Sequence, residues 1–284
     1  LDISSLDYET VLIDNTSENE LILNTDTLDD ISKNKPILLI IEDHFEIRNL
    51  IKNNFANHFK IFTSTNGLEG KEKAFKIIPD IIISDIMMPK LNGLKLCKIL
   101  KSDSRTSHIP IILLTARGSH TFKIEGFEYG ADDYVTKPFN IDILTIRVKN
   151  LIKSRQILRE KFKKETLINP KDIAINDVDE VFIEKVIGII EKNISNSKFS
   201  VADFAISIGM SHSVLYRKTL AITGQTITEF IKSIRLTKAE ELILKSNYHI
   251  NKISDMTGFS NPSYFSTCFK KKHGFPPSEF GEEN

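Results

Sequence analysis

The feature that most constrains the fold is a set of short apolar runs that each end in a polar side chain. One run covers residues 80–84, is rich in isoleucine and is followed by Asp85. Runs of this length with β-branched residues favour buried β-strands. Similar runs end at the polar residues Glu42, Asp43, Thr115 and Lys137. In an open parallel sheet such strand ends share one edge, which is where these sheets bind ligands.

Strands and helices alternate along residues 35–155. Strands are expected over residues 37–42, 60–64, 80–84, 109–115 and 132–135, and helices over 45–57, 67–77, 92–102, 120–129 and 140–158. This alternation predicts an α/β fold with a parallel sheet and helices on both faces. Five strands fit the flavodoxin-like order 2-1-3-4-5, which brings Glu42, Asp43 and Asp85 together between strands one and three.

The rest of the chain is of a different type. Residues 179–284 carry only amphipathic helical patterns, over 179–194, 201–208, 212–221, 226–245, 250–257, 262–273 and 277–280. These patterns predict an all-α domain. The charged and then polar stretch 156–178 is expected to be a partly helical linker, and the acidic stretch 1–34 either a linker or the remnant of an upstream domain.

The bulk composition sets further limits. The chain has 284 residues and a formal net charge of zero, which fits about two soluble domains. No apolar run reaches the ~18 residues of a membrane span. Cys97 and Cys268 fit reduced, packed residues rather than a disulfide or a metal site. We expect a cytoplasmic protein without direct membrane contact. Because the first residue is Leu1 and not Met, we interpret the chain as part of a longer protein, whose other part can be membrane-anchored.

The predicted cluster of carboxylates suggests phosphoryl chemistry. Clustered carboxylates repel one another and favour a hard cation such as Mg²⁺, which prefers oxygen ligands. An aspartate in such a site can accept a phosphoryl group. The ammonium of Lys137 and the hydroxyl of Thr115 would then stabilise the phosphoryl oxygens. Each residue alone also has a structural alternative, such as a helix N-cap for the acids or a surface position for Lys137. Their convergence on one edge favours the phosphoryl site.

Four segments within residues 36–155 carry these polar positions. They are Ile40-Ile41-Glu42-Asp43, Asp85-Ile86-Met87-Met88-Pro89 with Gly93, Leu114-Thr115-Ala116, and Gly130-Ala131-Asp132-Asp133-Tyr134-Val135-Thr136-Lys137-Pro138-Phe139. Together they resemble the receiver domain of bacterial response regulators. The resemblance implies that Asp85 is the phosphoacceptor and that Lys137 pairs with the phosphoryl group, with a cis Lys137–Pro138 bond. The implied Mg²⁺ ligands are Glu42, Asp43, Asp85 and the backbone carbonyl of Met87.

The same resemblance implies a switch. Phosphorylation draws Thr115 toward the phosphoryl group, and Tyr134 turns into the space that Thr115 leaves. This repacks the surface of the receiver's fourth helix, fifth strand and fifth helix. A homodimer through the receiver is expected when the protein is phosphorylated. The phosphoryl donor is expected to be a histidine kinase, either upstream in a hybrid parent polypeptide or in a separate protein.

Two stretches of the helical region have the pattern of a helix-turn-helix. In the first, Gly209 supplies the turn and Ser211 caps the next helix. A second copy follows about 50 residues later, with its turn at Gly258. The helical stretch 227–245 between them would hold two reader helices ~34 Å apart, one turn of duplex DNA.

Further segments support this pattern. They are Gly224-Gln225-Thr226-Ile227-Thr228-Glu229-Phe230, Arg235-Leu236 with Ala239, Gly258-Phe259-Ser260-Asn261-Pro262-Ser263-Tyr264-Phe265, and Phe269-Lys270 with Gly274, Pro277, Ser278 and Phe280. They resemble the AraC/XylS-type DNA-binding domain. Two positions depart from it: Gly281 stands where arginine often follows the last aromatic residue, and Ser254 where alanine is common. Tyr264, Phe265 and Phe269 are expected in the core.

The resemblance implies double-stranded DNA as a partner. Arg217 is the best candidate for a bidentate contact with a guanine edge. Lys218, Lys270 and Lys271 are expected at phosphates. The expected reader positions are His212, Ser213, Tyr216 and Arg217 on the first helix, and Asn261, Ser263, Ser266, Thr267 and Lys270 on the second.

The favoured interpretation is a phosphorylation-controlled, DNA-binding transcriptional regulator of a two-component system, with no enzyme activity beyond self-dephosphorylation. One rival is a phosphohydrolase with an aspartyl nucleophile, but this would need an acid two residues after Asp85, where Met87 stands. A second rival is a phosphate-sink receiver, which the DNA-binding half argues against. A third is DNA binding that does not depend on phosphorylation.

Overall fold

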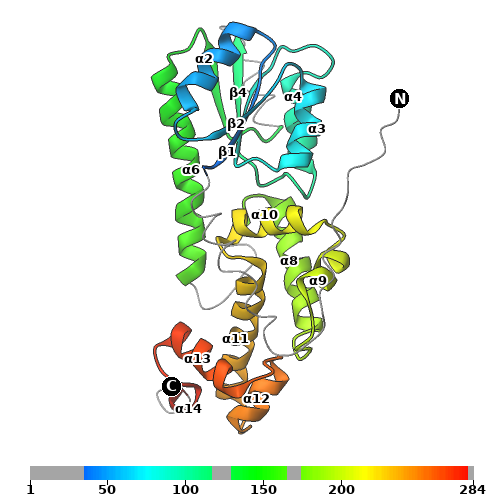
Figure 1. Ribbon diagram of the computed structural model, residues 1–284, viewed down its shortest axis with the longest axis vertical. Coiled ribbons are helices and arrows are strands. Elements are labelled where there is room, and N and C mark those ends of the chain that lie inside the picture. Colours follow the sequence, from blue (N-terminus) through cyan, green and yellow to red (C-terminus); the bar gives the residue numbers. More distant parts are fainter. Residues whose placement is uncertain (1–34, 117–128, 165–173, 281–284) are drawn as a thin grey trace, which may run out of the picture. The chain divides into compact units, whose positions relative to one another are not determined.

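A five-stranded parallel sheet organises the first half of the chain in the computed structural model, which describes residues 35–116, 129–164 and 174–280 (Figure 1). The strands are β1 (Ile37–Ile41), β2 (Lys60–Ser64), β3 (Ile81–Asp85), β4 (Ile111–Ala116) and β5 (Asp133–Lys137). Their order is β2-β1-β3-β4-β5, which confirms the predicted topology. Register pairs Ile41 with Ser84 and Asp85 with Leu114, so the ends of β1 and β3 are adjacent.

Helices cover both faces of this sheet. The described helices are α2 (Phe45–Phe55), α3 (Gly67–Ile77), α4 (Gly93–Ser102) and α6 (Ile141–Lys164). Figure 1 shows α3 and α4 on one side of the sheet and α2 and α6 on the other. Successive residues of β1 pack on opposite faces of the sheet. Leu39 belongs to the core on the α3–α4 side and Leu38 to the core on the α2–α6 side. A strand buried on both faces has no polar alternation, which explains the continuous apolar runs of the sequence.

The second half is helical in the described residues. Its helices are α8 (Asp177–Lys192), α9 (Val201–Ile208), α10 (His212–Thr223), α11 (Ile227–Lys245), α12 (Ile250–Met256), α13 (Pro262–His273) and α14 (Pro277–Phe280). They form two hydrophobic cores. Phe204, Leu215 and Phe230 belong to the first, and Phe265 and Phe269 to the second. Helix α11 contributes residues to both cores and so joins the two helix-turn-helix units.

Most predicted boundaries lie within two residues of the observed ones. β4 begins at Ile111 instead of residue 109, and α8 begins at Asp177 instead of residue 179. Helix α6 continues to Lys164, which makes the expected linker partly helical. Of the helix expected over 120–129, only residue 129 lies within the described residues. Position Gly281 lies outside them. Among the described helices, none combines the length and the apolar character that crossing a bilayer requires.

The two helix-turn-helix units use glycine at the turn for partly different reasons. Gly209 and Gly258 have φ of +78° and +76°, a conformation that side chains other than glycine rarely adopt. A Cβ on Gly209 would meet no atom within 4 Å. A Cβ on Gly258 would lie 2.2 Å from the Ile194 carbonyl oxygen and 3.0 Å from the Arg235 guanidinium. The second turn therefore also requires close approach of the backbone.

This difference gives a test of the fold. Gly209→Ala should lower the free energy of unfolding by about 1 kcal/mol through the positive φ alone. Gly258→Ala should cost about 2 kcal/mol more, because the added methyl group also overpacks the turn. Urea denaturation of the full chain, followed by far-UV circular dichroism, measures both. Equal losses of unfolding free energy for the two variants would show that the close contact with the Ile194 carbonyl oxygen adds no cost at Gly258.

Candidate functional site

The predicted polar residues meet at one edge of the sheet. Glu42 follows β1, Asp85 ends β3 and Lys137 ends β5, while Thr115 is the next-to-last residue of β4. All these strands are parallel, so their carboxyl ends lie on the same side. Residues nearly 100 positions apart in the sequence thus become neighbours.

A lysine ammonium links two of the acids. The Nζ of Lys137 lies 2.7 Å from Glu42 Oε2 and 3.0 Å from Asp85 Oδ2. Glu42 is fully buried and Asp85 is 5% exposed. Burial raises the pKa of the Glu42 carboxyl and the charge of Asp85 raises it further, whereas the hydrogen bond from Lys137 opposes this rise. Burial and mutual repulsion therefore disfavour the ionised form of these carboxyl groups, and a bound cation would favour it.

The surrounding backbone holds these side chains in place. The Ile86 amide donates to Asp85 Oδ1 at 2.8 Å. Gly93 packs so closely that a Cβ there would lie 2.1 Å from the Asp85 carbonyl oxygen. The Arg48 guanidinium donates to the carbonyl oxygens of Glu42 and Asp43 at 2.6 and 3.1 Å. The Lys137–Pro138 bond is cis, as expected.

The donor set fits a hard divalent cation. Glu42, Asp43, His44 and Asp85 each offer one ligand atom, and these atoms all lie within 4.8 Å of one another. Three carboxylates face one lysine ammonium, which leaves the cluster with excess negative charge, and oxygen donors are those that Mg²⁺ prefers. The sequence prediction missed His44, whose ring nitrogen Nδ1 lies 3.0 Å from Asp43 Oδ1. Its only sequence signal was its place directly after the two acids.

The two expected switch residues are both buried. Thr115 is 1% exposed, and its hydroxyl donates to the Ala116 carbonyl oxygen at 3.4 Å. Tyr134 is 7% exposed and packs with the core on the α3–α4 side of the sheet. This burial raises the pKa of the Tyr134 phenol. The structure thus places Tyr134 in the core beside β4, and the predicted turn of its ring toward the space left by Thr115 stays a prediction.

The predicted reader residues lie at or near the surface of α10 and α13. Tyr216 and Ser266 are half-buried, and Asn261 caps α13 by accepting from the amides of Ser263 and Tyr264. The exposed members are His212, Ser213, Arg217, Asn261, Ser263, Thr267 and Lys270.

Two expectations for this region are wrong. Lys218 is 0% exposed, so it does not lie on a phosphate-facing surface. Its neighbours Leu215 and Ile222 are core residues at helical spacing, which was the signal for an inward position. Tyr264 is 40% exposed, although Phe265 and Phe269 are fully buried as predicted. The Tyr264 hydroxyl instead accepts from Lys232 Nζ at 3.2 Å.

Comparison with known protein families agrees with this arrangement. A model described as the response regulator receiver domain matches residues 38–149. A model described as a helix-turn-helix domain, of AraC type, matches residues 204–283. The two matches cover the sheet with its helices and most of the helical half.

Several curated proteins are similar to this chain. Histidine kinase P4 of Formosa agariphila is 40% identical over 261 residues, which are 91% of this chain and 19% of that protein. The DNA-binding dual master transcriptional regulator RpaA of Synechocystis is 36% identical over 49% of this chain and 58% of its own length. The chain thus spans about a fifth of the first relative and somewhat more than half of the second. A crystal structure of a putative response regulator from Chloroflexus aurantiacus is 34% identical and covers 42% of this chain and 98% of its own, with a TM-score of 0.39.

A further relative covers enough of its own length to fix the family. The response regulator ArlR of Staphylococcus saprophyticus is 32% identical over 158 residues, which are 51% of this chain and 70% of that protein. The chain therefore belongs to the response regulators, and combines a receiver domain with an AraC-type helix-turn-helix domain.

Proposed function

We propose that this chain is a transcriptional regulator whose binding to double-stranded DNA is controlled by phosphorylation of Asp85. The contact of Asp85 with Lys137, inside a carboxylate cluster and on the same chain as two helix-turn-helix units, carries the proposal. The receiver would span residues 35–155, the linker 156–178 and the DNA-binding domain 179–284. Binding to DNA would make the cytoplasm the compartment in which the chain acts.

The chemistry at Asp85 follows from its neighbours. A carboxylate oxygen of Asp85 attacks the phosphorus of a phosphohistidine, the P–N bond breaks, and the leaving imidazole takes a proton from solvent. Lys137, 3.0 Å from Asp85, balances charge on the incoming phosphoryl group. Mg²⁺ held by Glu42, Asp43, Asp85 and the Met87 carbonyl would neutralise further phosphoryl charge.

Thr115 and Tyr134 are proposed to change conformation when Asp85 is phosphorylated. The Thr115 hydroxyl belongs to the strand next to Asp85 and would turn from its bond with the Ala116 carbonyl toward a phosphoryl oxygen. Because Tyr134 is already buried, its ring would adjust within the core and not enter it from solvent. The change would then reach the outer face of β5 and α6.

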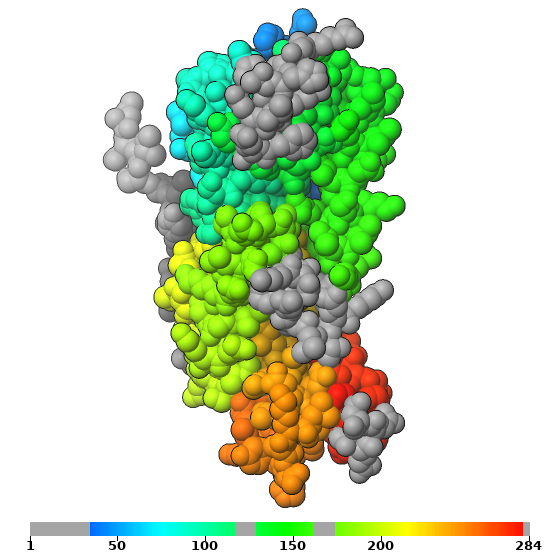
Figure 2. Space-filling model, turned by 180° about the vertical axis from the view of Figure 1, so that it is seen from behind, coloured from blue at the N-terminus to red at the C-terminus, as the bar shows by residue number. Residues whose placement is uncertain are grey.

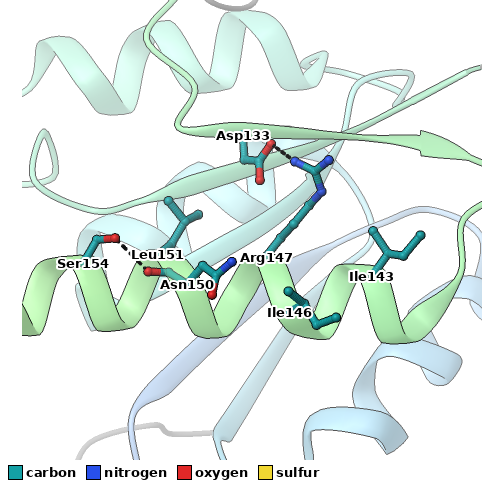
Figure 3. A pocket seen from close by; sticks show the side chains of 7 residues that line it. All are labelled: Asp133, Ile143, Ile146, Arg147, Asn150, Leu151 and Ser154. Carbon is teal, nitrogen blue, oxygen red and sulfur yellow. Dashed lines mark hydrogen bonds and ion pairs between the residues drawn. The ribbon is translucent and has the colours of Figure 1, made fainter.

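The outer face of α6 supports a homodimer of the phosphorylated protein. Helix α6 is at the molecular surface (green in Figure 2). Ile143 and Ile146 are 49% and 57% exposed and border a cavity of about 400 Å³ beside the Arg147–Asp133 ion pair of 2.5 Å (Figure 3). Exposed apolar side chains beside an ordered ion pair are suited to protein contact.

A histidine kinase is the proposed phosphoryl donor. The relative from Formosa agariphila, of which this chain matches about a fifth, is named a histidine kinase. This supports a hybrid parent in which the kinase and this regulator share one polypeptide.

The two reader helices are proposed to enter successive major grooves. Helix α11 between them has 19 residues, a length of about 28 Å, which is close to one duplex turn. Arg217 on α10 would read a guanine edge. The remaining proposed contacts are His212, Ser213 and Tyr216 on α10, and Asn261, Ser263, Ser266, Thr267 and Lys270 on α13.

The phosphoacceptor role can be tested directly. Asp85→Asn removes the nucleophile while keeping the size of the side chain. We expect no labelling by acetyl phosphate and no change of DNA affinity with beryllofluoride, measured on a duplex selected from a random library by the beryllofluoride-treated wild-type protein. Asp142→Asn, an exposed change in the first turn of α6, should respond like the wild type. A full response of Asp85→Asn would exclude the proposed role.

The base-reading role of Arg217 requires a different comparison. Arg217→Ala should reduce discrimination at one base pair by about 1–3 kcal/mol. Lys270→Ala, which removes a proposed phosphate contact, should weaken binding to all duplexes alike. It should also reduce the slope of log affinity against log salt concentration by about 1. Binding assays on the selected duplex and its single-base variants, at several salt concentrations, measure both. Uniform weakening by Arg217→Ala would contradict base reading.

A further inference from the structure

Helix α10 does not stand free of the receiver, because three fully buried polar residues connect them. Lys218 Nζ on α10 donates to Asp179 Oδ1 on α8 at 2.6 Å and to Ser107 Oγ at 2.9 Å. The Ser107 hydroxyl in turn donates to Asp179 Oδ1 at 2.6 Å. All three residues are 0% exposed. Ser107 belongs to the receiver, in the loop between α4 and β4.

Other contacts reinforce the connection. The Arg217 guanidinium, the proposed base reader, donates to the Ile77 carbonyl oxygen at the end of α3. The Arg159 side chain of α6 donates to the Ala221 carbonyl oxygen of α10 at 2.6 Å. Val214 of α10 packs against the core on the α3–α4 side of the sheet. The receiver therefore contacts the same helix side that carries Arg217.

The second reader helix differs. Asn261, Ser263, Thr267 and Lys270 of α13 are exposed. Thr267 donates to the Ser263 carbonyl oxygen, and Asn261 accepts from amides of its own helix, so these bonds stay within α13 and its cap. In the described part of the chain, the hydrogen bonds from receiver side chains reach α10 and α8 but not α13.

The energetics of the contact suit a reversible association. Asp179 and Lys218 both belong to the helical half, so the receiver's approach removes an existing ion pair from water. Burial lowers the pKa of the Lys218 ammonium, and Asp179 opposes this shift. Desolvation of such a pair is costly and is offset only when hydrogen bonds satisfy its remaining groups. The Ser107 hydroxyl provides two such bonds, accepting from Lys218 and donating to Asp179 Oδ1, whereas Asp179 Oδ2 is buried without a hydrogen-bond partner. The desolvation cost is therefore offset only in part, which keeps the association reversible.

We propose that the receiver surface formed by Ser107 and the Ile77 carbonyl is a docking site for α10, which withholds the first reader helix from DNA and leaves α13 available. The proposal rests on the proposed DNA-binding function. It implies that the unphosphorylated protein engages one half-site through α13, and that phosphorylation adds the second through α10. The apparent dissociation constant for a two-half-site duplex then equals the intrinsic one divided by the fraction of undocked molecules.

Ser107→Ala tests this docking without altering the phosphoryl site or any proposed reader residue. The loss of a hydrogen bond to a charged group should favour the undocked state by about tenfold or more. If most wild-type molecules are docked, unphosphorylated Ser107→Ala should therefore bind the selected two-half-site duplex at least about tenfold more tightly than the unphosphorylated wild type. Its affinity with beryllofluoride should equal that of the wild type. Ser102→Ala, an exposed change at the end of α4, is the matched control.

Hydrogen–deuterium exchange without DNA provides an independent measurement. Amides of α10 should exchange faster in Ser107→Ala and in the beryllofluoride-treated wild type, while those of α13 should not change. Ser107→Leu, too large for a fully buried position, should give the larger effect. Unchanged α10 exchange and unchanged affinity in both variants would overturn the docking. If the beryllofluoride-treated wild type selects no duplex although α10 exchange responds, the DNA-binding function fails and the docking stands.

Discussion

Parallel strand pairing is the constraint on which the rest of the structure depends. Because β1, β3, β4 and β5 run in one direction, the residues that end these strands gather at one edge. Glu42, Asp85 and Lys137 meet there within hydrogen-bond distance. The loops that precede the strands gather at the opposite edge, where Ser107 contacts the helical half. One sheet thus separates the proposed phosphoryl site from the contact with α10 by the length of β4, about 20 Å.

The fold and the cluster of carboxylates with Lys137 could be predicted because their signals are local. Strands buried on both faces appear as uninterrupted apolar runs, and the residue after each run is placed by the strand itself. Glu42, Asp85 and Lys137 therefore needed no knowledge of distant partners. The turns at Gly209 and Gly258 were likewise visible, since a positive φ selects glycine at the end of a short helix.

The failures concern residues whose surroundings come from remote parts of the chain. Lys218 was expected at a phosphate; its spacing from Leu215 and Ile222 indicated an inward position, but its hydroxyl partner Ser107, 111 residues earlier, could not be found from that pattern. The bond from Arg217 to Ile77 spans 140 residues and has no counterpart in any motif. Local patterns predict the helix or strand to which a residue belongs. Whether a charged side chain is exposed also depends on residues from other parts of the chain that pack against it.

The separation of the two edges limits how the proposed phosphorylation of Asp85 could affect α10. Strand β4 is paired with β3 and β5 along its length, so it does not slide alone. Helix α6 is the better candidate for transmission, because Arg147 and Arg155 bind acids at the start of β5 while Arg159 binds the Ala221 carbonyl oxygen of α10. A second copy that covers Ile143 and Ile146 would act on this same helix. If docking is a small difference between the large opposing terms of the buried Asp179–Lys218 pair, a modest shift of α6 would be sufficient to change the fraction of molecules in which α10 is free.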